Sequence, residues 1–84
     1  MRVVISEHAE KRAEERGVSV EVIEDIVKRS EEVVTVKFGR KAAYRKYGDR
    51  YVVVIFEERK DEIVVVTTLK VDKERLKRYG FSRV

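Results

Sequence analysis

Three side chains able to handle a phosphate group lie at helical spacing near the start of the chain. His8, Arg12 and Arg16 are each four residues apart, so one helix would align them in a single row. An imidazole that titrates near neutral pH beside two permanent cations suits acid–base chemistry on a phosphate. The three residues are therefore candidate catalytic residues. A plainer interpretation stays open, in which the arginines pair with nearby glutamates and the histidine has no task.

A basic stretch in the middle of the chain provides a second set of candidates. Residues 37–50 hold six lysines and arginines against one acidic residue, which gives a net charge of +5. Tyrosines stand between these cations, and such a mixture offers phosphate contacts together with stacking surfaces for nucleic acid. Arg45 joins the candidate catalytic residues. The candidate nucleic-acid-binding residues are Arg40, Lys41, Tyr44, Lys46, Tyr47 and Arg50. A hairpin with a charged, solvated tip is the alternative.

A short helix is predicted to position the histidine row. Ser6 is a suitable N-cap, because its hydroxyl can accept a hydrogen bond from a free amide of the first turn. Gly17 is a suitable end, because glycine adopts the left-handed conformation that often follows a helix. Ala9 and Ala13 form a neighbouring row of small side chains, which would let this helix lie close to another element.

The rest of the chain alternates between helical and strand periodicity. A second helix follows Ser19, and its apolar stripe contains Ile23, Ile26 and Val27. From Glu32 onward the apolar period is two, as expected for strands separated by short turns. The predicted strands are residues 2–5, 32–38, 41–47, 50–58 and 62–70, with a hairpin turn at Gly39-Arg40 and a short C-terminal helix capped by Asp72.

This order of elements predicts an α+β fold in one domain, residues 1–84. Its order is β-α-α-β-β-β-β, with two N-terminal helices on an antiparallel sheet and a short C-terminal helix. The last four strands must form a meander, because their links are too short for crossovers. Residues 51–56 and 63–69 are apolar on both sides, as in strands covered on both faces. The second cover would be the C-terminal segment, another copy of the chain, or another protein.

Composition excludes several classes of site. The chain has no cysteine and one histidine, so we predict no metal site and no cofactor. No apolar run reaches membrane-spanning length and no signal-peptide pattern begins the chain, so we expect a cytoplasmic protein. The sequence also lacks Asn, Gln, Trp and Pro while 43% of it is charged, a composition typical of hyperthermophile proteins.

The run from His8 to Ser19 resembles the signature of a widespread family of small, uncharacterised bacterial and archaeal domains. The resembling residues are His8-Ala9, Arg12 and Glu15-Arg16-Gly17-Val18-Ser19, followed by an acidic helix, a basic hairpin and a Val-rich strand ending in Thr. That family is similar in topology to the RelE/ParE/BrnT toxin superfamily. The resemblance covers about residues 4–70.

The resemblance implies a toxin-like domain that binds RNA or cleaves messenger RNA without a metal. RelE-like members act on messenger RNA, often on the ribosome, and are neutralised by an antitoxin, whereas ParE-like members act on gyrase. The implied partners are RNA, a ribosome, an antitoxin-like protein, or a second copy bound through the apolar sheet face. A non-catalytic binding module and a partner-dependent protein remain open beside the endoribonuclease. The His8 row and the hairpin would share the chemistry if the hairpin leans against the first helix.

Overall fold

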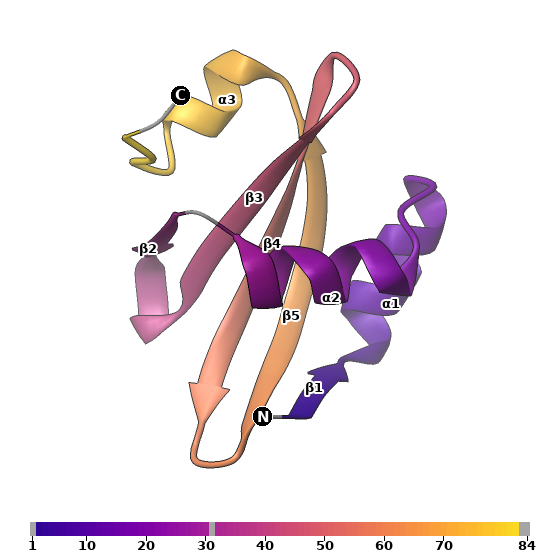
Figure 1. The fold of residues 1–84 in the computed structure, drawn as a ribbon, viewed down its shortest axis with the longest axis vertical. Helices are drawn as coiled ribbons and strands as arrows, with labels where there is room; N and C mark the ends of the chain where they lie inside the picture. Colours follow the sequence, from indigo (N-terminus) through magenta and orange to yellow (C-terminus); the bar gives the residue numbers. More distant parts are fainter. Residues whose placement is uncertain (1, 31, 83–84) are drawn as a thin grey trace.

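The computed structural model describes residues 2–30 and 32–82 (Figure 1). Two helices precede most of a five-stranded sheet and a short helix follows it, so the predicted α+β order is confirmed. The elements are β1 (Arg2–Ile5), α1 (Glu7–Glu15), α2 (Val20–Arg29), β2 (Val33–Thr35), β3 (Lys41–Tyr47), β4 (Arg50–Arg59), β5 (Glu62–Val71) and α3 (Lys73–Lys77).

The sheet combines the predicted antiparallel meander with one parallel edge. Strands β2 to β5 follow one another antiparallel, as their short links require. β1 pairs with β5 in parallel, which gives the order β1-β5-β4-β3-β2. The sheet is thus mixed rather than purely antiparallel. Both helices lie between β1 and β2, and this long link allows the two strands to occupy opposite edges.

The predicted helix ends are confirmed. The Ser6 hydroxyl accepts from the backbone N–H of Ala9 at 3.1 Å, and Ser19 caps α2 in the same way. Gly17 has a φ of 69°, the left-handed conformation that ends α1. The Asp72 carboxylate accepts from the N–H of Arg75 at 2.9 Å and begins α3.

Each face of the sheet has its own apolar core. On one face α1 and α2 bury Ala9, Ala13, Ile23 and Ile26 against the strands. Leu76 and Phe81, from α3 and the segment after it, are buried against the other face, and Figure 1 shows this segment crossing the end of the sheet. Of the three predicted covers for the second face, the C-terminal segment is the one that the structure contains.

The hairpin between β2 and β3 differs from the prediction. β2 ends at Thr35 instead of continuing to residue 38. The turn runs from Lys37 to Arg40, and its two central residues are Phe38 (φ 63°) and Gly39 (φ 69°). Positive φ at both central positions is the pattern of a type I′ turn. The sequence did not indicate it, because Phe38 continues the apolar alternation of the strand and is not a usual turn residue.

Candidate functional site

The histidine row lies on the exposed side of α1. Ala9 and Ala13 of this helix are buried against the sheet, while His8 and Arg12 are exposed and Arg16 is half-buried. Arg12 forms a loose ion pair with Glu15 at 3.8 Å. The His8 imidazole makes no hydrogen bond or ion pair within residues 2–30 and 32–82. The row therefore exists as predicted, but nothing in its surroundings holds the imidazole in one orientation.

Arg45 faces a different helix. Its guanidinium forms an ion pair with Asp25 and donates a hydrogen bond to the backbone carbonyl of Arg29 at 3.2 Å. Both partners belong to α2, whereas α1 packs mainly on β5. Because β4 separates β5 from β3 in the sheet, the row on α1 and Arg45 are attached to different parts of the molecule. The structure thus does not show the two candidate sets as one cluster.

At the base of the β3–β4 hairpin the predicted cations are neutralised. The Nε of Arg40 lies 2.9 Å from Glu57, and the Nζ of Lys41 lies 2.6 Å from Glu58. These pairs join Arg40, the residue before β3, and Lys41, the first residue of β3, to the last part of β4. Arg40 and Lys41 consequently have less charge to offer to an RNA phosphate than their sequence context indicated.

Glu57 is held in its charged form by these contacts. Hydrogen bonds from Arg40 first, and from Arg59 second, lower the pKa of the Glu57 carboxyl from its ordinary value of 4.5. A carboxyl with a lowered folded-state pKa adds stability above its unfolded pKa and loses it as the pH falls through the folded value. We expect wild type to lose more stability than Glu57→Gln between neutral pH and the region below 4.5. Urea unfolding at several pH values measures this, and parallel curves for the two proteins would contradict it.

The tip of the same hairpin is different, and we call Arg45, Lys46, Tyr47 and Arg50 the tip surface. Tyr47 and Arg50 are cross-strand partners, and Lys46 stands opposite Tyr51, with its Nζ 6.0 Å from the ring centre. Lys46, Tyr47 and Arg50 are exposed. Neither Lys46 nor Arg50 forms an ion pair within the described residues. Within the described residues, the tip therefore presents Lys46 and Arg50 beside aromatic rings without carboxylates bound to them, whereas Arg45 is paired with Asp25.

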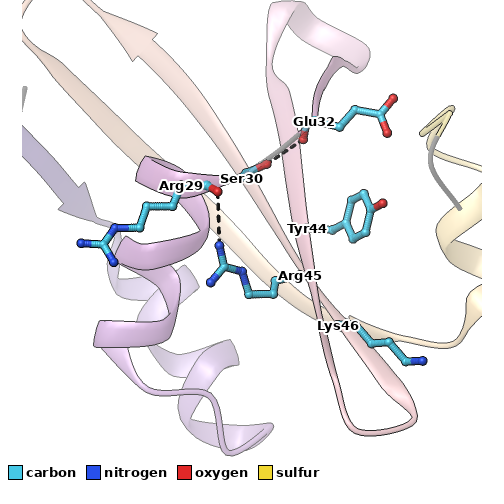
Figure 2. Close-up of a pocket in the computed structure, with 6 residues that line it drawn as sticks. All are labelled: Arg29, Ser30, Glu32, Tyr44, Arg45 and Lys46. Carbon is cyan, nitrogen blue, oxygen red and sulfur yellow. Dashed lines mark hydrogen bonds between the residues drawn. The ribbon is translucent and has the colours of Figure 1, made fainter.

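A pocket of about 250 Å³ adjoins the tip surface. Its lining residues are Arg29, Ser30, Glu32, Tyr44, Arg45 and Lys46. Figure 2 shows that Arg45 points toward the end of α2, whereas Tyr44 and Lys46 project to the other side of β3. The alternation follows from the strand itself, because successive side chains point to opposite faces. The pocket is thus lined by cationic side chains from both faces of β3, with Arg45 on one face and Lys46 on the other.

Acidic groups limit the positive charge of this pocket. Asp25 pairs with Arg45 and, more loosely, with Arg29 at 3.7 Å. The Glu32 carboxylate accepts from both the N–H and the hydroxyl of Ser82 at 2.7 Å. It therefore ties the C-terminal segment to the start of β2. Lys46 is the cation of the pocket that carries no such neutralisation in the described part of the chain.

Asp25, Arg29 and Glu32 were not predicted as site residues. Asp25 and Arg29 are four residues apart on α2, which looks like an ordinary surface pair in the sequence. Tyr44, in contrast, is less available than predicted, because its ring lies edge-on to that of Phe81 with centres 4.4 Å apart. Only the three-dimensional structure reveals these partners, since they come from α2 and from the C-terminal segment.

Within residues 2–30 and 32–82, no three His, Cys, Asp or Glu side chains gather in a way that could hold a metal ion. No helix in that part of the chain has the length and hydropathy needed to cross a membrane.

Comparison with known proteins gives a family and no function. Neither the curated proteins nor the solved structures include a match to this chain. A family model described as a domain of unknown function, DUF4258, matches residues 5–78. The match extends from β1 to the residue after α3, so it covers both helices and all the strands that form the candidate site. The chain therefore belongs to the DUF4258 family of small uncharacterised domains.

Proposed function

We propose that this domain binds single-stranded RNA through the tip surface and needs no metal to do so. The observation that carries the proposal is the pairing of exposed cations with tyrosines at the hairpin tip, where Tyr47 faces Arg50 and Lys46 faces Tyr51. Cations bind the phosphates of a single strand, and aromatic rings stack on its bases. The resemblance of the chain to RelE/BrnT-like proteins supports RNA as the nucleic acid.

The tip is a better RNA site than the histidine row for a physical reason. Arg12 has a glutamate partner on its own helix, and the four glutamates of residues 7–15 surround the row with negative charge. At the tip, residues 44–50 contain one acidic residue, Asp49, and Asp25 of α2 pairs with Arg45, so Lys46 and Arg50 are the cations left to attract phosphates. Phosphates would therefore be attracted to the tip and repelled from much of α1.

Cleavage is a separate step, and the structure gives it less support than binding. Metal-independent cleavage needs a proton acceptor for the 2′-hydroxyl and a donor for the leaving oxygen. His8, the strongest candidate for either task, lies exposed on α1, and its imidazole forms no hydrogen bond or ion pair within the described residues. We therefore propose a binding module of the RelE/BrnT type, with endoribonuclease activity as the second candidate, for which the tyrosines of the hairpin would be the nearest proton carriers.

Fluorescence anisotropy with a labelled single-stranded RNA, in the presence of a chelator, tests the proposal. We expect wild type to bind, with an affinity that falls as the salt concentration rises. A plot of the logarithm of the binding constant against the logarithm of the salt concentration should have a slope of about −2 if Arg45, Lys46 and Arg50 each contact one phosphate. Lys46→Ala and Arg50→Ala are expected to weaken binding and to reduce that slope by about 0.7 each.

Lys11→Ala and His8→Ala are the matched controls, because these residues are also exposed but lie on α1. Both should bind RNA like wild type. Equal losses in the tip variants and the α1 variants would mean non-specific attraction and would overturn the proposal. Gel analysis of the same mixtures detects cleavage, and cuts that disappear in His8→Ala would replace our proposal with an enzyme centred on the histidine row.

A further inference from the structure

A second hollow, which the RNA proposal does not use, lies on the face of the sheet that α3 partly covers. Its volume is about 440 Å³. Val36 and Ile55 contribute apolar surface to it, Phe38 and Tyr79 contribute aromatic rings, and Lys37 and Arg78 contribute cations. Its lining residues come from the end of β2 and the turn after it, from β4 and from the residues that follow α3, a helix of five residues. We call these six residues the apolar hollow.

Phe38 is the least expected residue of the apolar hollow. Its side chain is 88% exposed, the highest value among the large hydrophobic residues that the structure places at the surface. Its backbone is in the left-handed region with a φ of 63°, which is costly for a residue with a bulky side chain. Burial does not explain this conformation, and the Arg40 guanidinium lies 5.9 Å from the ring centre, at the outer limit of a cation–π contact. Residues held in such sparsely populated backbone conformations are concentrated at functional sites, so the exposed Phe38 ring is a candidate contact for a binding partner.

The charges around the apolar hollow have one sign. Lys37 and Arg78 are exposed and form no ion pair within residues 2–30 and 32–82. Arg75 lies beside Arg78 and Tyr79 in an adjoining depression. Arg40, whose charge Glu57 compensates, is the remaining cation of the lining. A ligand that fills the apolar hollow would therefore meet two or three uncompensated cations and no uncompensated carboxylate in its lining.

We propose that the apolar hollow docks a segment of a partner protein that presents apolar side chains flanked by carboxylates. Apolar side chains would cover Val36 and Ile55 and pack against the Phe38 ring, and the carboxylates would meet Lys37 and Arg78. Interfaces of this kind combine aromatic anchors with a complementary charged rim. RNA fits less well, because Val36 and Ile55 of the lining are aliphatic and offer no ring on which a base could stack. The proposal is independent of the RNA site at the tip surface.

Two capped synthetic peptides provide the probe. One alternates leucine pairs with glutamates, and the other has lysine at every glutamate position. Titration into isotope-labelled wild-type protein is expected to shift the amide signals of Val36, Phe38 and Ile55 with the acidic peptide, and to leave them in place with the basic one. Phe38→Asn should weaken binding of the acidic peptide by about tenfold or more, as for a central aromatic anchor. Arg78→Gln should weaken it several-fold, and Lys46→Gln is the control that should bind normally.

Phe38→Asn also separates docking from folding. Asparagine tolerates the left-handed conformation and is the preferred partner of glycine in this type of turn. We therefore expect the variant to raise Tm by roughly 4–8 °C while it weakens peptide binding. A loss of stability instead would show that Phe38 serves the fold, and would overturn the proposal.

Four other outcomes would overturn it as well. The acidic peptide could fail to bind, or the basic peptide could bind equally well. Single-stranded RNA could compete with the peptide and shift the same three amides, which would make the apolar hollow part of a nucleic-acid surface. Sedimentation of the protein alone could reveal a dimer that Phe38→Asn dissociates, and the occupant would then be a second copy of this chain.

Discussion

Leu76→Ala is expected to lower the free energy of unfolding by about 2–5 kcal/mol, the usual cost of removing a fully buried leucine side chain. Leu76 is completely inaccessible to solvent and belongs to the core on the second face of the sheet. It is also the buried residue of α3, a helix of five residues that is too short to be stable without packing. The variant should therefore release the C-terminal segment in addition to creating a cavity.

Release of that segment would have a second consequence. Phe81 packs against Tyr44, and Ser82 binds the Glu32 carboxylate, so these contacts would be lost together. The apolar face of β4 and β5 would then be exposed, and a continuous exposed apolar face favours association between protein molecules. We expect Leu76→Ala to show a lower urea midpoint and a greater tendency to aggregate than wild type.

Urea unfolding followed by circular dichroism measures the first effect, and light scattering measures the second. Lys77→Ala is the matched control, because Lys77 is exposed on the same helix. It should change the unfolding free energy by less than about 0.5 kcal/mol. A similarly small change for Leu76→Ala would mean that the C-terminal segment adds little to the core, and that the second face must be covered in another way.

The sequence predicted the elements better than their contacts. Ser6, Gly17, Ser19 and Asp72 indicated helix ends correctly, because caps depend on local hydrogen bonds and local backbone conformation. The meander could also be predicted, since short links leave antiparallel pairing as the only arrangement. The need for two covers followed from strands that are apolar on both sides, although the sequence left open what the second cover was.

The sequence could not predict which carboxylates neutralise which cations. The pairs of Arg45 with Asp25 and Arg40 with Glu57 join residues that are 20 and 17 positions apart. Their formation depends on strand register and on how α2 lies on the sheet, and neither is encoded locally. The basic hairpin therefore looked uniform in the sequence, whereas the structure neutralises Arg40, Lys41 and Arg45 and leaves Lys46 and Arg50 without an ion pair in the described part of the chain.

The turn at Phe38 was missed for a different reason. Apolar alternation is evidence for a strand only while the backbone stays extended, and Phe38 keeps the alternation while its backbone has turned. Local preference and observed conformation disagree at this residue. Such disagreements are concentrated at functional sites in natural proteins, and Phe38 is the exposed aromatic residue of the apolar hollow.

A charge exchange between Asp25 and Arg45 is expected to separate the structural task of Arg45 from its proposed task in RNA binding. Arg45→Glu removes the hydrogen bond to the Arg29 carbonyl and places a carboxylate beside Asp25. We expect it to lower the unfolding free energy by about 1–2 kcal/mol, since the pair is partly exposed and each interaction is modest. RNA affinity should fall about tenfold or more, because a cation of the tip surface becomes an anion.

The double variant, with Asp25→Arg added to Arg45→Glu, restores an ion pair at the same place with its charges reversed. We expect urea unfolding to show that most of the lost stability returns, because an ion pair between β3 and α2 depends little on which element carries the cation. RNA affinity should stay low, since the guanidinium now extends from α2 and the hairpin tip has lost one of its three cations. If RNA binding recovered together with stability, Arg45 would act only by fixing β3 to α2, and the phosphate contacts would have to come from Lys46 and Arg50.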